Sequence, residues 1–213
     1  YYFLFEDSKG QIWIGKEDGL IVAGTDDTLK EFFTGNSKYT VTKATEYDNK
    51  IFFATGQSVI LIYDLEKQTF EEAIYEGGAF FTDIAYLPDQ KLILLSQKHG
   101  IFIYNTNSGI FELSKLNNDP DLTGYIRLIV DKKKGVWVYN TSGMVWYYNQ
   151  QRKQMRKMRL IPEEITNMID LERYLIFIDS TGLIWITTYG NGLFCYNPLT
   201  DELSNYTNSS DPN

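Results

Sequence analysis

Carboxylates are the most frequent groups in this 213-residue chain that could carry out chemistry. Glu6, Asp7, Glu46, Asp131 and Asp179 stand at the ends of predicted strands. A suitably spaced pair of such acids can act as proton donor and nucleophile in glycoside hydrolysis. These acids, however, fall in a recurring hairpin-turn frame, which gives them a structural role. We therefore predict no catalytic activity for this chain, and a glycosidase or lactonase is the less favoured alternative.

Other reactive groups are too few to build a centre. His99 is the only histidine and Cys195 the only cysteine, whereas a zinc site needs several such ligands, so we expect no metal and no cofactor. Cys195 is predicted to be a buried small apolar residue on a strand. Gly190-Asn-Gly192 lies between two predicted strands and not before a helix, which indicates a turn and not a phosphate loop.

The elements that position these residues are repeated. Asp7-Ser-Lys-Gly-Gln-Ile-Trp13 returns as Asp179-Ser-Thr-Gly-Leu-Ile-Trp185, and a related frame runs from Asp131 to Trp137. A Tyr followed by Asn or Asp stands 11 residues after the second-strand position in the later copies. Counting back by this spacing makes five positions equivalent: Trp13, Phe52, Ile93, Trp137 and Trp185. A repeat of this length is typical of a stacked or circular array.

Each copy reads as four short strands rich in β-branched and aromatic residues. In the last copy these are Tyr174–Ile178, Leu183–Thr187, Gly192–Tyr196 and Glu202–Tyr206. Glycines are expected at positive φ in the first hairpin (Gly10, Gly135, Gly182). The second hairpin contains Gly19, Gly100, Gly143 and Gly192, just before the third strand. The pattern predicts an all-β β-propeller of about five four-stranded blades in one domain, residues 1–213. The expected blades are 1–34, 41–72, 80–114, 124–158 and 165–207.

The tryptophans on the second strands are predicted to be structural. Burying such a ring contributes about 1.5–3 kcal/mol, so Trp13→Ala and Trp185→Ala are expected to damage the fold, and Trp137 should pack in the same way. One short helix is expected in Pro162–Leu171, where Pro-Glu-Glu precedes spaced apolar residues.

Charge excludes some partners. The formal net charge of −8 disfavours nucleic acid, and the chain has no apolar run long enough to span a membrane, so contact with a membrane would come only through a parent protein. One basic run contains Arg152, Lys153, Arg156, Lys157 and Arg159. We interpret it as an outermost strand whose charges prevent edge-to-edge pairing, with a phosphate or partner patch as the alternative.

The frame resembles the two-component regulator propeller repeat. The residues that carry the resemblance are Phe5-Glu-Asp7-Ser-Lys-Gly10-Gln-Ile-Trp13-Ile-Gly15, and Phe177 to Thr188 continuing through Gly192-Leu-Phe-Cys-Tyr196-Asn-Pro198. Copies 2 and 3 depart from it, with Phe52 and Ile93 in place of Trp. The resemblance implies a periplasmic sensor region of a bacterial hybrid two-component histidine kinase and response regulator receptor. It also implies an oligosaccharide ligand and a fragment of a larger, seven-bladed array, with the kinase in the parent protein.

A ligand site is predicted on the face formed by the inter-blade loops and the second hairpins. Aromatic rings stack on sugar rings, and amides or imidazoles hydrogen-bond hydroxyls. The candidate residues there are Tyr75, Phe80, His99, Tyr125, Tyr139, Tyr189 and Asn191. The alternative is that these are ordinary loop and packing residues, and a non-signalling interaction scaffold is the runner-up function. Further partners expected are other blades of the same receptor or a second copy.

Overall fold

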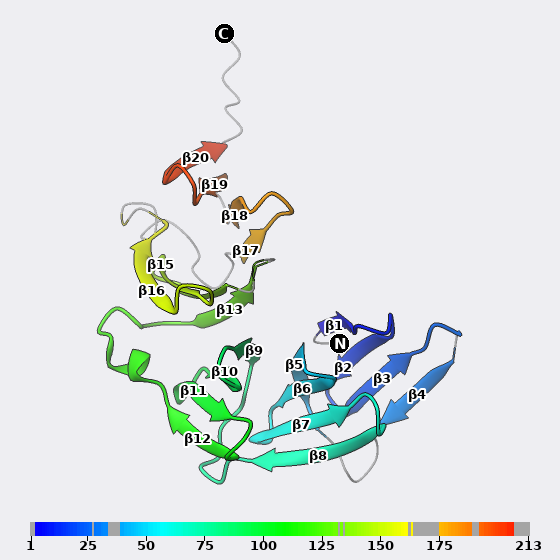
Figure 1. Ribbon diagram of the computed structural model, residues 1–213. Helices are drawn as coiled ribbons and strands as arrows, with labels where there is room; N and C mark the ends of the chain where they lie inside the picture. Colours follow the sequence, from blue (N-terminus) through cyan, green and yellow to red (C-terminus); the bar gives the residue numbers. More distant parts are fainter. Residues whose placement is uncertain are drawn as a thin grey trace. The chain divides into compact units, whose positions relative to one another are not determined.

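The computed structural model describes residues 3–26, 28–33, 39–131, 133, 135–161, 163, 175–188 and 192–206. These residues form five four-stranded antiparallel sheets, and in each sheet the strands lie in chain order (Figure 1). The predicted all-β class, with five four-stranded blades of a propeller-like fold, is confirmed. None of the described helical residues forms a helix long and apolar enough to cross a membrane.

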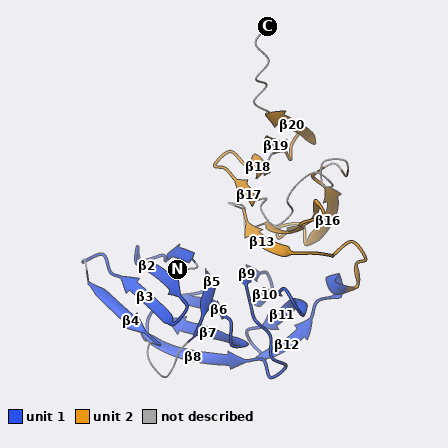
Figure 2. Ribbon diagram, turned by 180° about the vertical axis from the view of Figure 1, so that it is seen from behind, with its two compact units in different colours: residues 1–117 blue, residues 118–213 orange. Residues whose placement is uncertain are grey.

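The chain divides into two compact units, Tyr1–Asn117 and Asn118–Asn213 (Figure 2). The first unit holds three blades. Blade 1 is β1 (Phe3–Glu6), β2 (Ile12–Lys16), β3 (Gly19–Ala23) and β4 (Leu29–Phe32). Blade 2 is β5 (Val41–Tyr47), β6 (Lys50–Thr55), β7 (Val59–Asp64) and β8 (Thr69–Ile74). Blade 3 is β9 (Asp83–Leu87), β10 (Lys91–Ser96), β11 (Gly100–Asn105) and β12 (Ile110–Leu113). A 3-10 turn at Lys115–Asn118, not expected from the sequence, follows β12.

The second unit holds two blades. Blade 4 is β13 (Ile126–Val130), β14 (Val136–Asn140), β15 (Met144–Asn149) and β16 (Gln154–Arg159). Blade 5 is β17 (Leu175–Ile178), β18 (Ile184–Thr187), β19 (Leu193–Asn197) and β20 (Glu202–Tyr206). These bounds lie within one residue of the four strands predicted for the last copy. The helix expected over Pro162–Leu171 falls, apart from Glu163, outside the described residues. That all five blades belong to one propeller domain stays a prediction.

Within each unit the hydrophobic cores lie between neighbouring blades. Trp13 is fully buried, and its ring centroid lies 5.1 Å from that of Phe53 and 4.9 Å from that of Tyr63, both in blade 2. A second cluster joins blades 2 and 3 and includes Phe52. A third joins blades 4 and 5 and includes Trp137. The face that carries the second-strand ring therefore packs on the next blade, which confirms the register deduced from the spacing.

The Asp-to-Trp frame is a hydrogen-bonded clamp. In blade 1, Oδ1 of Asp7 accepts from the backbone N–H groups of Lys9 and Gln11, both at 2.9 Å, and Oδ2 accepts from Nε1 of Trp13 at 2.8 Å. Asp131 and Asp179 make the equivalent bonds in blades 4 and 5. Each acid thus closes a hairpin, as the frame predicted, and also orients the indole that follows, which the sequence did not reveal.

The glycine prediction for the first hairpin holds in two of three blades. Gly10 and Gly182 have φ of 77° and 91°. Gly135 does not lie in the left-handed region, so its prediction was wrong. Gly135 is four residues after its clamp acid, whereas Gly10 and Gly182 are each three residues after theirs. Its role is close approach, because a Cβ there would lie 2.4 Å from the ring of Tyr147. The four second-hairpin glycines all have positive φ.

Candidate functional site

Antiparallel order gives each blade two distinct edges. The turns between first and second strands and between third and fourth strands share one edge, here named the Asp edge because the clamps lie there. The second hairpins and the links between blades share the other, here named the link edge. The site predicted from the sequence lies on the link edge.

In the first unit the three predicted residues differ in exposure. Tyr75 packs its ring 4.9 Å from Phe102 and 5.6 Å from Phe111, so it is a packing residue. Phe80 is 48% exposed and covers Gly56, where a Cβ would lie 2.4 Å from its ring. His99 is partly buried, with Nδ1 3.4 Å from Oγ of Ser96.

In the second unit the predicted set is divided. Tyr125 is 43% exposed, and the guanidinium of Arg127 lies 5.2 Å from its ring centroid. Tyr139 is only 3% exposed and belongs to the core between blades 4 and 5, so it is a packing residue in this structure. Its strand, β14, is an inner strand of the blade, and all five of its residues are buried. Tyr189 and Asn191 lie outside the described residues, and a ligand role for the others stays a prediction.

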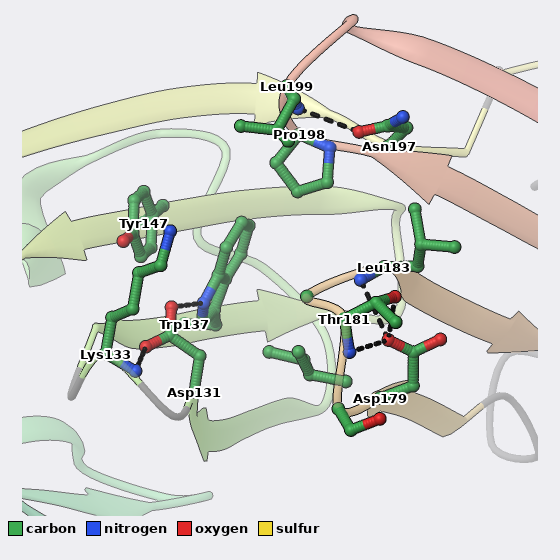
Figure 3. Close-up of a pocket in the computed structure, with 13 residues that line it drawn as sticks. Asp131, Lys133, Trp137, Tyr147, Asp179, Thr181, Leu183, Asn197, Pro198 and Leu199 are labelled. Carbon is green, nitrogen blue, oxygen red and sulfur yellow. Dashed lines mark hydrogen bonds between the residues drawn. The ribbon is translucent and has the colours of Figure 1, made fainter.

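The structure places a cavity of about 360 Å³ on the opposite, Asp edge, between blades 4 and 5 (Figure 3). Small-molecule sites usually occupy roughly 300–1,000 Å³, so this cavity is at the lower end of that range. Blade 4 contributes Asp131, Lys133, Trp137 and Tyr147, and blade 5 contributes Ile178, Asp179, Ser180, Thr181, Gly182, Leu183, Asn197, Pro198 and Leu199.

One wall of this blade 4–5 cavity is aromatic. Trp137 and Tyr147 are cross-strand partners on β14 and β15, and their rings stack with centroids 4.1 Å apart at 26°. The side chain of Lys133 extends beside this wall toward Tyr147, and Pro198 and Leu199 lie on the other side (Figure 3). Trp137 is only 5% exposed and belongs to the core between blades 4 and 5, so a ligand could contact only the part of this ring pair that lines the cavity, with an apolar turn on the other side.

The two carboxylates of the cavity are held by donors. Asp131 accepts from the N–H groups of Lys133 at 2.8 Å and Gly135 at 2.7 Å, and from Nε1 of Trp137 at 3.0 Å. Asp179 accepts from the hydroxyl of Thr181 at 2.6 Å and from the indole of Trp185 at 2.8 Å. These bonds, the Thr181 hydroxyl first, hold the pKa of Asp179 well below its usual range.

The electrostatics of the cavity suit binding better than proton transfer. Because Asp179 stays ionised at neutral pH, it accepts hydrogen bonds and has no proton to donate as a general acid. Burial, and then the Asp131 carboxylate, raise the pKa of Tyr147, so this phenol remains a neutral donor. The lining thus offers acceptors, one ammonium and hydroxyls around an apolar middle.

The corresponding position between blades 1 and 2 is nearly closed. The cavity there is about 120 Å³, and Nζ of Lys9 donates to the carbonyl of Leu65 at 2.6 Å across it. The N–H of Leu65 in turn donates to the carbonyl of Asn49 at 2.9 Å. In blade 5 the residue at this position is Pro198, which has no N–H to donate. Loss of that bond between two turns is consistent with the wider cavity.

Sequence reasoning missed this cavity. The available signal was Pro198, directly after the recurrent Tyr-Asn pair, where Leu65 and Thr106 stand in blades 2 and 3. Both of those residues donate their N–H to the neighbouring turn, to Asn49 and to Gln90. Pro198 therefore marks a turn in blade 5 that cannot make this backbone bond.

The basic run lies on the outermost strand, β16, and the turn before it, as predicted. Two of its members have acidic partners. Arg156 contacts Asp201 at 3.1 Å, and Lys157 contacts Asp119 and Asp121, both at 2.6 Å. These pairs account for part of the run without a phosphate ligand. Cys195 is free and buried, as expected, and its burial raises the pKa of the thiol.

Fold and cavity together define a β-propeller-like protein with a small site between two blades. Neither a family model nor a curated protein matches the sequence. Among solved structures, the extracellular domain of a protein assigned as a one component system of B. thetaiotaomicron superposes with a TM-score of 0.72 at 16% identity, over 97% of this chain and 30% of that one. The extracellular domain of a protein assigned as a hybrid two component system of the same organism gives 0.63 at 16% identity, over 94% and 29%.

An enzyme shares the fold as well. Virginiamycin B lyase from Staphylococcus aureus superposes with a TM-score of 0.72 at 14% identity, over 96% of this chain and 69% of that one. At such identities the likeness shows the fold alone. The chain spans less than a third of either receptor domain.

Proposed function

We propose that this chain is an extracellular ligand-sensing propeller module of a bacterial signal-transduction receptor. The support is the fold that it shares with extracellular domains of one and hybrid two component systems, together with the resemblance of its repeat frame. In this proposal the parent is a hybrid two-component receptor, the module lies in the periplasm, and a histidine kinase outside these 213 residues carries the output. Other blades of that receptor, or a second copy, would complete the array.

The ligand in this proposal is a neutral oligosaccharide bound in the blade 4–5 cavity. The observation that carries it is the stacked Trp137–Tyr147 wall beside fixed acceptors and an ammonium. Sugars present both an apolar ring face and hydroxyls that donate and accept, and this lining offers a partner to each.

Catalysis is the competing function, because a lyase has the same fold. The two acids of the cavity argue against it, since both are occupied by turn and indole donors. His99, the only histidine, lies on the link edge of unit 1, whereas the cavity lies on the Asp edge of unit 2. No nucleophile and base are paired within the cavity lining.

The test is calorimetric titration of the purified chain with neutral oligosaccharides, followed by chromatography of each mixture. We expect saturable heat with at least one sugar, and the sugar recovered unchanged. Conversion of the sugar would replace sensing with catalysis. Absence of heat with every sugar, from a chain shown to be folded by circular dichroism, would contradict sugar binding at this cavity.

A further inference from the structure

A lysine contact is present at the smaller of these Asp-edge cavities and is not found among the described residues at the larger one. In blade 1, Lys9 stands two residues after the clamp acid Asp7, and its N–H donates to that acid at 2.9 Å. Its ammonium then crosses to blade 2 and donates to the carbonyl of Leu65 at 2.6 Å. This contact, here named the lysine latch, joins the first turn of one blade to the third turn of the next.

Blade 4 carries the same lysine without the latch. Lys133 stands two residues after Asp131, and its N–H donates to that acid at 2.8 Å, so its side chain leaves the turn at the same point as that of Lys9. Among the residues that the structure describes, no hydrogen bond or ion pair of the Lys133 ammonium is found. The side chain lies along the aromatic wall, next to the cavity (Figure 3).

The opposite turn lacks the backbone N–H bond that its counterpart in blade 2 makes. Pro198 occupies the position of Leu65 and cannot donate to a neighbouring turn, and Leu199 is 88% exposed. The cavity between the two turns has about 360 Å³, against about 120 Å³ where the latch is closed. An object large enough to fill this space would touch the lysine and the turn together.

Resting on the proposed function, we propose that the bound sugar itself completes the latch between blades 4 and 5. One sugar ring packs against the part of the Trp137–Tyr147 pair that lines the cavity, and a ring or hydroxyl oxygen accepts a hydrogen bond from the Lys133 ammonium, in the place that the Leu65 carbonyl takes for Lys9. The far side of the ring packs on Pro198 and Leu199. Binding therefore joins two turns that are separate in the free protein.

The charges of the lining favour a neutral sugar over an acidic one. Asp131 and Asp179 place two carboxylates at the cavity against the single Lys133 ammonium. A sugar carboxylate would gain one charge-assisted bond but would lie near two like charges. A neutral ring can accept from Lys133 and donate a hydroxyl to a lone pair that the turn and indole donors leave on a clamp acid, without adding a third negative charge.

The consequence for function is that ligand binding would further order the turn after β19. The turn after β19 is already held by the Arg156–Asp201 ion pair, and the ligand adds contacts from this turn to the first turn of blade 4, so its backbone opening should become rarer on binding. A receptor could read this as a stiffer junction between the two blades, because the ligand favours the state in which they are joined. The signal would then start at the Asp edge.

The experiment combines titration with hydrogen exchange on the 213-residue chain. The probes are maltose, cellobiose and xylobiose, with galacturonic acid as the charged comparison. For a probe that binds, we expect slower exchange of the amides in residues 196–201, and Lys133→Met should lower the affinity about tenfold and remove that protection. Lys9→Met is the matched control, because it removes the latch of blades 1 and 2 and should leave the sugar affinity within about twofold.

The outcomes separate the two proposals. A neutral probe that binds equally to wild type and Lys133→Met, without protection of residues 196–201, overturns the latch and leaves sugar sensing standing. Tighter binding of galacturonic acid that depends on Lys133 overturns the neutral ligand class. Failure of all four probes to bind the folded chain overturns both the latch and the sugar site.

Discussion

The indole N–H of Trp13 donates a 2.8 Å hydrogen bond to Oδ2 of Asp7, six residues earlier in the chain. The same bond joins Trp137 to Asp131 at 3.0 Å and Trp185 to Asp179 at 2.8 Å. Because the other oxygen of each acid accepts turn N–H groups, one carboxylate fixes both a hairpin and the orientation of a packing ring. The constant Asp-to-Trp spacing of the repeat is a consequence of this geometry.

Replacing the clamp acid by its amide should destabilise the fold. In Asp7→Asn only one oxygen remains, so either the turn N–H groups or the Trp13 indole must face an NH₂ group. Leaving a buried donor unsatisfied costs about 1–3 kcal/mol, and we expect the free energy of unfolding to fall by that amount in urea titrations. Asp48→Asn is the control, because Asp48 is an exposed turn residue at φ 50°, a conformation that Asn tolerates. Equal stability of Asp7→Asn and wild type would show that the clamp contributes little.

The three tryptophans should not be equally important. Trp13 is fully buried against blade 2, and Trp13→Ala should cost about 3–5 kcal/mol through the cavity that it leaves. Trp185 is only half-buried in the described structure, with its ring 6.0 Å from that of Tyr206. We therefore expect a smaller loss for Trp185→Ala than the sequence alone predicted. Urea midpoints of the two variants measure the difference, and an equal loss would mean that Trp185 is covered as Trp13 is.

Much of the fold could be predicted because the repeat is local. The fixed distance from each second-strand residue to the Tyr at the end of the third strand follows from a hairpin of nearly constant length. It located Phe52 and Ile93 even though neither is Trp, and both are buried at the expected face. Propensity and turn residues sufficed for the strand bounds, since none of these elements depends on a distant contact.

The site could not be predicted in the same way. The repeat spacing places Tyr139 near the end of a strand, next to a hairpin. The burial of its side chain depends on how blade 5 packs over it, which the spacing does not show. The open cavity depends on a missing N–H in one blade and on a lysine in another, and a repeat pattern does not reveal how such turns meet. In blades 2 and 3, pairs of positive-φ residues such as Asp48 and Asn49 replace the Asp-to-Gly frame. Those copies therefore lacked the frame but kept the hairpin.

Stability at low pH should depend on Asp119. Its carboxylate accepts from the Lys157 ammonium at 2.6 Å and from Nε1 of Trp146 at 2.9 Å. These bonds, Lys157 first, lower its pKa from 3.8 to about 2. Because the folded pKa lies below the unfolded one, the contribution is complete above about pH 4 and is lost as the pH falls through 3.8 toward 2.

The check compares wild type with Asp119→Asn. We expect the wild type to have the higher urea midpoint at neutral pH, with the gap narrowing between pH 3.8 and about 2. Arg156, whose partner is Asp201, offers a control, because Arg156→Gln should leave the Asp119 component of the pH profile intact. A gap that stays constant down to pH 2 would show that Asp119 is not perturbed in the folded protein.

The location of the ligand site can be decided by a matched pair of substitutions at the two edges. Tyr147→Leu removes an aromatic face from the Asp-edge wall and keeps apolar bulk over Trp137, whereas Phe80→Leu makes the same kind of change at the exposed link edge. If sugars stack on the Trp137–Tyr147 wall, Tyr147→Leu should lower the affinity about tenfold, or about 1.4 kcal/mol, and Phe80→Leu should leave it unchanged in calorimetry. Circular dichroism of both variants controls for folding. The reverse result, with affinity lost only in Phe80→Leu, would return the site to the link edge that the sequence alone predicted.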